Sequence, residues 1–203
     1  MENVYLSPAS YASAEIVEKR SRFIGSIAHV DSEQEALEFV KSVKKQYHDA
    51  KHSAYAYIVS DTKRYSDDGE PAKTAGLPIL EMLDAQKITD CVCVVTRYFG
   101  GILLGTGGLV RAYTAAAKLA LEEAGIKRLT LHNEYIMTVP YSIFDSVKYI
   151  ATEAGCEFLN CDYTDVISVD AVCEEEKCEN LITSLTGAFG VNIKIEFMKQ
   201  LYR

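Results

Sequence analysis

Five of the twelve glycines in this 203-residue chain fall within Gly100–Gly108, and this turn constrains the fold more than any other feature. It follows residues 90–98, DCVCVVTRY, an almost continuous apolar run that predicts a central strand buried on both faces. After the turn, a segment from about Gly107 to Ala124 has apolar residues at helical spacing, and Gly125 is placed to end that helix. Its many alanines would let the helix lie close to a sheet. The pattern predicts a mixed α/β domain.

Two interpretations of the glycine turn stay open. A helix N-terminus offers free N–H groups and the positive end of the helix dipole to an anion, such as a phosphate of RNA. Arg97 and Arg111 would add positive charge, and Thr106 is the expected N-cap. Alternatively, the glycines only permit a tight connection. The sequence matches neither a Walker loop nor a GxGxxG fingerprint, so spacing alone does not choose.

A second polar cluster, HDAKHSAYAY, contains His48 and His52, which are four residues apart. On one continuous helix the two imidazoles would share a face and a metal ion. The helix predicted over residues 32–47 is expected to end between them, however, before a strand over residues 53–60. Solvated polar residues at the end of a loop are therefore the favoured interpretation.

The third cluster lies in residues 61–76, DTKRYSDDGEPAKTAG, which form the longest expected irregular stretch. Its carboxylates are Asp67, Asp68 and Glu70, with Lys73 close by. Paired carboxylates hold Mg²⁺ or act as acid and base, but Asp-Gly sequences are also ordinary turn chemistry. A short helix expected to begin near Thr74 would offer a second N-terminus to an anion.

Periodicity predicts the remaining elements. In the first half we expect two strands within residues 13–30 with a turn at Lys19–Ser21, a helix capped by Ser32 and Glu35, and a helix over residues 74–84, bent or restarted at Pro78. In the second half, after strand 128–139, Ser142 with Asp145 is expected to open a helix, followed by strands 156–163 and 165–173, helix 174–186 and a last strand through Phe197. That order, β-α-β-β-α-β, is ferredoxin-like. We therefore predict an α+β protein with domains at 1–128 and 129–203.

Composition restricts the function classes. Residues 1–128 carry 16 Lys/Arg and 17 Asp/Glu, whereas residues 129–203 carry 5 and 12. Any contact with nucleic acid should therefore come from local basic patches in the first half, or should avoid the acidic faces. No apolar stretch is long enough to span a membrane, and the N-terminus lacks a signal-peptide pattern. The six cysteines form no C-x-x-C pair and are expected to be buried, reduced thiols. We expect a cytoplasmic protein.

Three ordered motifs, KHSAYAY, YSDDGEPAKTAGLPIL and VVTRYFGGILLGTGGLVRAY, together resemble the bacterial two-domain YigZ branch of the IMPACT family. The resemblance implies a first domain similar to the second domain of a small-subunit ribosomal protein. It also implies a second domain similar to the last domain of elongation factor G. Both likenesses point to the translation apparatus, by analogy of fold.

The resemblance also implies a function. Eukaryotic relatives regulate translation by interfering with the activation of an initiation-factor kinase, through protein contacts rather than catalysis. We therefore expect a non-enzymatic regulator that binds the ribosome, RNA or a translation protein, without cofactor, metal or catalytic residue. The expected binding residues, at positions that match the family motifs or adjoin them, are His52, Asp67, Asp68, Glu70, Lys73, Arg97, Gly100, Gly101, Gly105, Thr106, Gly107, Gly108 and Arg111.

An enzymatic alternative stays open. In it, Asp67, Asp68 and Glu70 hold Mg²⁺, the glycine turn cradles a phosphate, and His52 is acid or base for a nucleotide or phosphorylated small molecule. The oligomeric state is not predicted by any feature of the sequence.

Overall fold

The computed structural model describes residues 4–203 and divides the chain into two compact units. One unit comprises Tyr5–Arg128, and the other comprises Leu129–Arg203 with the start of the first strand. Strand β1 (Val4–Pro8) pairs with strand β7 (Ile126–Val139), whose first three residues belong to the N-terminal unit.

The N-terminal unit is built on a five-stranded sheet in which all neighbours are antiparallel. In spatial order its strands are β2 (Ala12–Glu18), β3 (Ser21–His29), β6 (Cys91–Tyr98), β4 (His52–Val59) and β5 (Thr62–Ser66). The apolar run before the glycine turn is thus the central strand, as predicted. Its first seven residues are buried.

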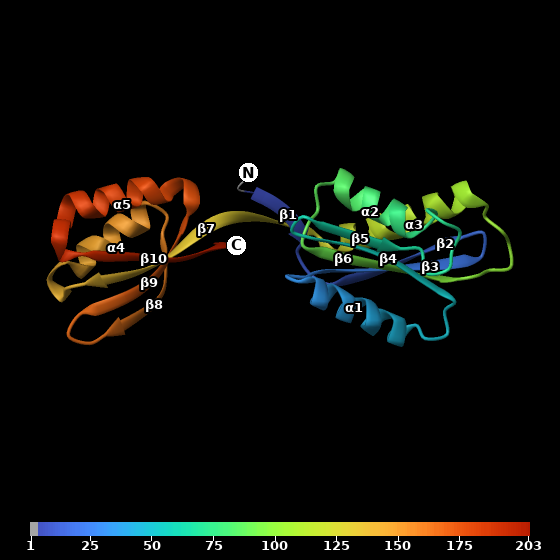
Figure 1. Cartoon of the computed structure of the whole chain (residues 1–203), viewed down its shortest axis with the longest axis horizontal. Helices are drawn as coiled ribbons and strands as arrows, with labels where there is room; N and C mark the ends of the chain where they lie inside the picture. Colours follow the sequence, from blue (N-terminus) through green and yellow to red (C-terminus); the bar gives the residue numbers. More distant parts are fainter. Residues whose placement is uncertain (1–3) are drawn as a thin grey trace. The chain divides into compact units, whose positions relative to one another are not determined.

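Helices cover both faces of this sheet (Figure 1). On one face α1 (Glu33–Gln46) packs against Val92 and Val94 of β6. On the other face α2 (Gly76–Ala85) and α3 (Thr106–Ala124) pack against Cys91, Cys93 and Val95. Because side chains alternate along a strand, the side chains of residues 91–95 of β6 belong alternately to two cores.

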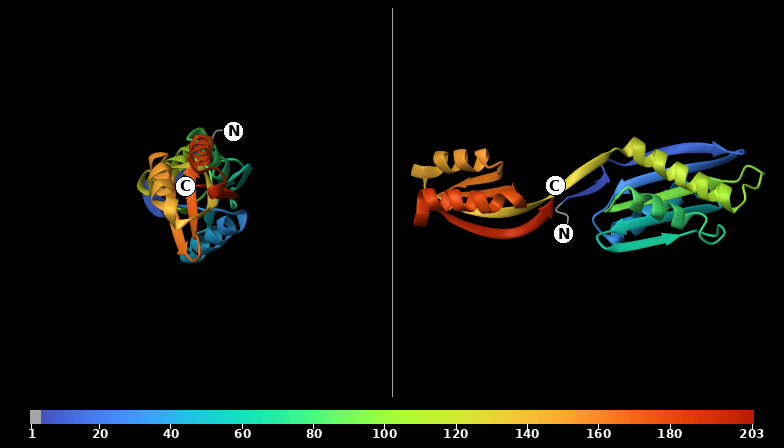
Figure 2. Two further views of the ribbon diagram at one scale, coloured as in Figure 1. Left: turned by 90° about the vertical axis from the view of Figure 1, so that its left-hand side faces the viewer. Right: turned by 90° about the horizontal axis from the view of Figure 1, so that it is seen from above.

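Helix α3 lies close to strands β2 and β3 (Figure 2, right). At the closest approach, a Cβ added to Gly25 of β3 would lie 2.4 Å from the carbonyl oxygen of Ala116. Only a glycine opposite an alanine-rich helix permits this spacing. Gly125 ends the helix with a φ of 67°, as predicted from its place in the sequence.

The C-terminal unit has the predicted order β-α-β-β-α-β. Its elements are β7, α4 (Phe144–Glu153), β8 (Glu157–Tyr163), β9 (Ile167–Glu174), α5 (Glu175–Phe189) and β10 (Lys194–Tyr202). Strand order β10-β7-β9-β8, antiparallel throughout, gives a ferredoxin-like sheet with both helices on one face. The α+β class is confirmed, and the likeness to the last domain of elongation factor G stays a prediction.

Three local expectations were wrong. The stretch expected to be irregular contains β5, which Ser60, at a φ of 50°, and Asp61 join to β4 as a tight hairpin. Helix α2 begins at Gly76, with Pro78 in its first turn, where a missing N–H costs nothing. Ser142 does not cap α4, because the 3-10 turn Tyr141–Ile143 precedes that helix and no side chain caps it.

The structure also bears on the expectations for the cysteines and for membrane-spanning segments. All six cysteines are free thiols; five are buried, and Cys161 is half-buried. Within residues 4–203, no helix combines the length and apolar character that crossing a membrane requires.

Candidate functional site

Strand register brings two of the expected site residues together. Arg97 continues the alternation of Cys91, Cys93 and Val95, so its side chain lies on the sheet face covered by α2 and α3. His52 on β4 is directly opposite Arg97 in the ladder, and Phe23 on β3 is opposite it on the other side. Directly opposed residues on neighbouring strands share a face and lie close together. Residues from two separate sequence motifs therefore meet at one end of the sheet.

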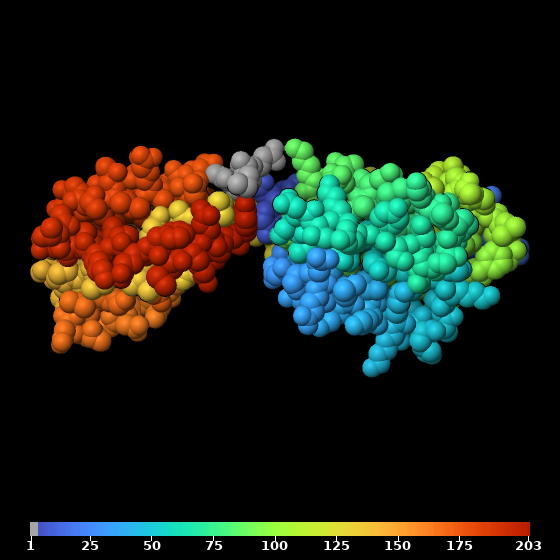
Figure 3. Space-filling view, viewed as in Figure 1, coloured from blue at the N-terminus to red at the C-terminus, as the bar shows by residue number. Residues whose placement is uncertain are grey.

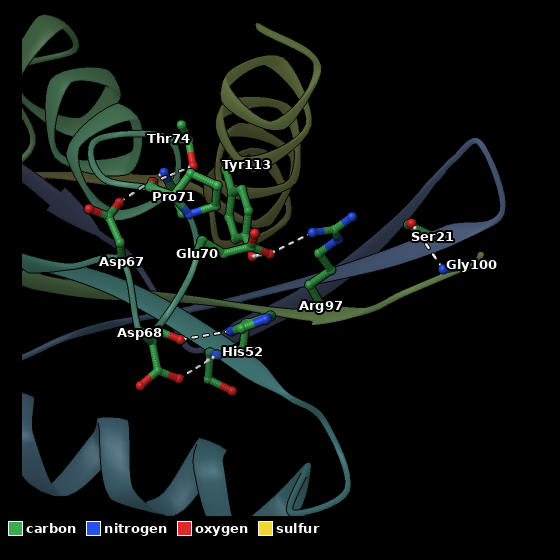
Figure 4. Close-up of polar contacts among 12 residues, drawn as sticks. Ser21, His52, Asp67, Asp68, Glu70, Pro71, Thr74, Arg97, Gly100 and Tyr113 are labelled. Carbon is green, nitrogen blue, oxygen red and sulfur yellow. Dashed lines mark hydrogen bonds and ion pairs between the residues drawn. The ribbon is translucent and has the colours of Figure 1, made fainter. Parts of the chain in front are cut away.

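Arg97 is held by a buried carboxylate from the acidic loop (Figure 4). Nη1 of Arg97 donates to Oε1 of Glu70 at 2.7 Å, and the hydroxyl of Tyr113 on α3 donates to the same oxygen at 2.9 Å. The side chains of Arg97 and Glu70 are only 8% and 3% exposed. Burial raises the pKa of the Tyr113 hydroxyl well above its usual range, and the adjacent Glu70 carboxylate adds to the rise. Tyr113 therefore stays a hydrogen-bond donor.

His52 is oriented by the backbone of the same loop. Its Nδ1 lies 2.8 Å from the carbonyl oxygen of Asp68. A carbonyl oxygen only accepts, so Nδ1 carries the proton and Nε2 is the ring nitrogen left for another partner. The loop backbone needs glycine next: Gly69 has a φ of 85°, and a Cβ there would lie 3.2 Å from Nδ1 of His52.

The two aspartates of the loop hold other parts of the protein. Asp68 binds Nζ of Lys44 on α1 at 2.6 Å and accepts from the backbone N–H of Ser53 on β4 at 2.7 Å. The side chain of Asp68 thus joins the loop to a helix and a strand.

The carboxylate of Asp67 lies at the N-terminus of α2. Its Oδ1 accepts from the N–H groups of Ala75 and Gly76 at 3.0 and 2.9 Å, and Oδ2 accepts from Lys73 N–H at 2.8 Å. The helix N-terminus expected to bind an external anion is therefore occupied by the chain's own carboxylate. The side chain of Lys73 is exposed, and its φ is 63°.

The three acidic side chains do not converge. Glu70 faces Arg97, Asp68 faces α1 and β4, and Asp67 faces α2. The loop lies at the surface of the unit (Figure 3, turquoise), but its carboxylates accept hydrogen bonds from other parts of the same unit. Among residues 4–203 there is no group of three or more His, Cys, Asp or Glu side chains arranged to hold a metal ion. The carboxylate set expected for Mg²⁺ is therefore not assembled.

A pocket of about 260 Å³ opens beside Arg97. Its lining consists of Lys51, His52, Arg97, Phe99 and Leu103. Three of these side chains are basic or can be protonated, two are apolar, and none is acidic. The volume is slightly below the range of roughly 300–1,000 Å³ that is usual for small-ligand sites.

The Arg97 guanidinium does not pair all of its hydrogen-bond donors among the described residues. Its guanidinium carbon lies 5.5 Å from the ring centroid of Phe23 and 5.4 Å from that of Phe99. Its buried Nε has no hydrogen-bond partner in the part of the chain that the structure describes. Buried donors are normally paired, and because Arg97 lines the pocket, this unpaired N–H makes the pocket a candidate place for an acceptor.

The glycines of the turn have different tasks. A Cβ added to Gly100 would lie 2.1 Å from the carbonyl carbon of Arg20, and the Gly100 N–H donates to Oγ of Ser21 at 3.1 Å. Gly101 and Gly105 have φ values of 83° and 72°, with open space where a side chain would lie. Close packing thus explains Gly100, and backbone conformation explains the other two.

The start of α3 differs from the expectation. Gly105 is the N-cap, not Thr106, and no side chain caps the helix. Thr106 is the first helical residue and is exposed, as are Gly107 and Arg111. Gly108 packs against Leu104, where an added Cβ would be 2.9 Å from the leucine Cβ. Arg111 does not line the pocket.

The structure thus assembles part of the expected site. His52 and Arg97 meet at the pocket, where the carbonyl of Asp68 orients His52 and the carboxylate of Glu70 binds Arg97. The sequence motifs did not predict that Lys51, Phe99 and Leu103 line the pocket. Two apolar side chains in a glycine-rich turn could have indicated an exposed apolar surface there. The motifs also did not predict the role of Tyr113, which follows the same helical period as the core residues of α3.

Comparison with known proteins gives consistent matches. Residues 19–121 match the Impact N-terminal domain. The chain is 34% identical to the IMPACT family member YvyE of Bacillus subtilis (strain 168), over 87% of this chain and 83% of the relative. It is 37% identical to the IMPACT family member YigZ of Escherichia coli (strain K12), over 78% and 80%. A solved structure described as a hypothetical protein matches 98% of this chain and 99% of its own, with a TM-score of 0.67 and 31% identity.

Proposed function

This chain belongs to the IMPACT family, and from that premise we propose that it is a non-catalytic binding protein of the translation apparatus. Its N-terminal unit would contact RNA by placing a phosphate in the pocket of Lys51, His52 and Arg97. The family resemblance supports the link to translation, and the basic side chains of the pocket support phosphate binding. The proposal covers the binding class and does not depend on a particular RNA sequence.

The observation that carries the proposal is the separation of charges around the pocket. Each carboxylate of the acidic loop is directed to an internal partner, whereas the side chains of Lys51, His52 and Arg97 line the opening. Lys51 is exposed and makes no ion pair with any residue from 4 to 203. A pocket with basic walls and no acidic wall favours an anionic ligand.

The distribution of charge along the chain supports the same location. The C-terminal segment 129–203 carries 5 basic and 12 acidic residues, which opposes contact with a phosphate backbone. The N-terminal segment is nearly neutral, so a local basic site there is not outweighed by the unit's net charge.

Magnesium-dependent catalysis receives less support. Its three proposed carboxylate ligands hold separate elements, and among residues 4–203 no serine, threonine, cysteine or carboxylate side chain lines the pocket. Histidine is the side-chain type that most often acts as a general acid or base, and His52 is the histidine that lines the pocket. An acid–base group without a nucleophile or metal ligands is better suited to binding than to phosphoryl chemistry.

The test is binding of the purified full-length chain to ribosomes and to a short unstructured RNA across a salt series. We expect Lys51→Ala to weaken RNA binding and to reduce the slope of log K against log salt by about 0.7–1, the value for one lost phosphate contact. The matched control is Lys41→Ala, which removes an exposed lysine from α1 on the other face of the sheet. No binding at low salt, or equal effects of the two substitutions, would refute the proposal.

A further inference from the structure

We infer that the pocket is specific for a nucleoside 5′-monophosphate group, either at the 5′ end of an RNA strand or as a free nucleotide. The phosphate would contact Lys51, His52 and Arg97, and the base would stack on Phe99. This inference rests on the proposed function and adds the kind of phosphate that is recognised.

Arg97 has an unpaired hydrogen-bond donor. The Arg97 side chain is 8% exposed, lines the pocket, and has a buried Nε without a partner among the described residues. Its Nη1 is already bound to Glu70. The remaining N–H groups of a guanidinium form a planar fork that fits the oxygens of a phosphate. The salt bridge to Glu70 fixes the plane of that fork before any ligand arrives.

Two further side chains, His52 and Lys51, bring donors to the pocket. Nε2 of His52 is the free ring nitrogen, because Nδ1 donates to the carbonyl of Asp68. Lys51, the preceding residue, brings an ammonium group to the same pocket. Three side chains therefore offer donors to one small volume. A terminal phosphate has three non-bridging oxygens and up to two negative charges, whereas a phosphodiester inside a strand has two such oxygens and one charge.

The site is a small pocket rather than an extended groove. A phosphodiester within a strand must have RNA leaving in two directions, which suits an extended groove. Here five residues from two strand ends and the glycine turn line a pocket of about 260 Å³. A pocket of that size suits the end of a strand or a single nucleotide.

Part of the pocket lining is apolar and exposed. The Phe99 side chain is 55% exposed although its ring lies 5.4 Å from the Arg97 guanidinium carbon, and Leu103 is 83% exposed. Two exposed apolar side chains that line one small pocket form an apolar surface, and a planar group can cover it. A nucleobase adjacent to the bound phosphate would do so by stacking on Phe99.

The experiment compares two versions of one short, unstructured oligoribonucleotide, one with a 5′-phosphate and one with a 5′-hydroxyl, by fluorescence anisotropy with the dye at the 3′ end. We expect the 5′-phosphorylated strand to bind wild-type protein about tenfold more tightly. Lys51→Ala should reduce its affinity to that of the 5′-hydroxyl strand, and Lys41→Ala should change neither. Lys51 is exposed, so the substitution should leave folding intact.

A second set of variants tests stacking separately from charge. Phe99→Ala should weaken binding of adenosine 5′-monophosphate about fivefold or more, while binding of inorganic phosphate stays unchanged. Phe99→Trp should retain nucleotide binding, because its ring also stacks. Equal losses for both probes would contradict the stacking role.

The outcomes separate this inference from the proposed function. Equal affinity for the two strand ends, with RNA binding retained, would overturn the inference and leave the proposed function standing. Binding of the nucleotide but not of RNA would support the pocket's specificity and refute the proposed function. Stronger competition by a peptide with a free C-terminal carboxylate than by the nucleotide would overturn the inference in favour of a protein ligand.

Discussion

Glu70 and Arg97 form a salt bridge at the pocket wall, and Tyr113 donates a second hydrogen bond to the same carboxylate oxygen. Removing two charges from water has a large cost, which is offset only when geometry and further hydrogen bonds are good. Both conditions are met on the Glu70 side, where the two contacts are 2.7 and 2.9 Å long, whereas Nε of Arg97 is left without a partner among the described residues. The arrangement keeps a charged arginine in place at the end of an otherwise apolar strand.

We predict that Glu70→Ala lowers the free energy of unfolding by about 3–5 kcal/mol, because Arg97 would be left as a buried, uncompensated charge. Tyr113→Phe should cost about 1 kcal/mol, the value of one hydrogen bond. Urea denaturation followed by far-ultraviolet circular dichroism measures both. If Glu70→Ala cost no more than Tyr113→Phe, the salt bridge would not have the structural role assigned to it.

At the scale of elements, the acidic loop connects four parts of the N-terminal unit. Asp67 caps α2, Asp68 binds α1 and β4, and Glu70 binds β6 and α3. The loop also fixes the imidazole of His52 through a backbone carbonyl. Its carboxylates therefore position the pocket without lining it.

The glycine turn is the second element that shapes the pocket, and its glycines should differ in their tolerance of alanine. We predict that Gly100→Ala destabilises the protein by more than about 1 kcal/mol, because its Cβ would lie 2.1 Å from Arg20. Gly107→Ala should stabilise it by about 0.4–1 kcal/mol, because an added Cβ in the first turn of α3 has ordinary contacts. Thermal unfolding of the two variants measures the difference. Similar effects of both would mean that the close approach at Gly100 is relaxed by a small backbone shift.

At the scale of the whole molecule, each unit has its own hydrophobic core. The clusters on the two faces of the N-terminal sheet use residues from Leu6 to Ala124, and the C-terminal cluster uses residues from Tyr135 to Ile195. A unit with a self-contained core meets the main requirement for independent folding.

We therefore predict that a fragment of residues 1–128 folds without the C-terminal unit and unfolds cooperatively. It retains the whole five-stranded sheet, α1 to α3 and every residue that lines the pocket. Circular dichroism with thermal denaturation measures folding, with the full-length chain as the reference. A fragment with little secondary structure or a non-cooperative transition would show that residues 129–203 are needed for the N-terminal fold.

The sequence by itself determined most elements and their order. Apolar periodicity predicted the buried central strand, the amphipathic helices and the β-α-β-β-α-β order of the second unit. Local chemistry predicted the cap of α1 at Ser32 and the end of α3 at Gly125. These features depend on interactions between residues close in sequence, which is why a pattern records them. The short strand β5 was missed because its polar residues, TKRYS, lack the alternation typical of a half-buried strand.

Only the tertiary structure decided which polar residues meet. Glu70 reaches Arg97 across 27 positions and Tyr113 across 43, and His52 faces Arg97 through strand register. In the sequence, nothing distinguishes a carboxylate that binds Mg²⁺ from one that caps a helix or neutralises a buried arginine. The difference lies in non-local contacts, which spacing does not encode. The glycine turn was located by its sequence, but the pocket beside it became visible only in the folded chain.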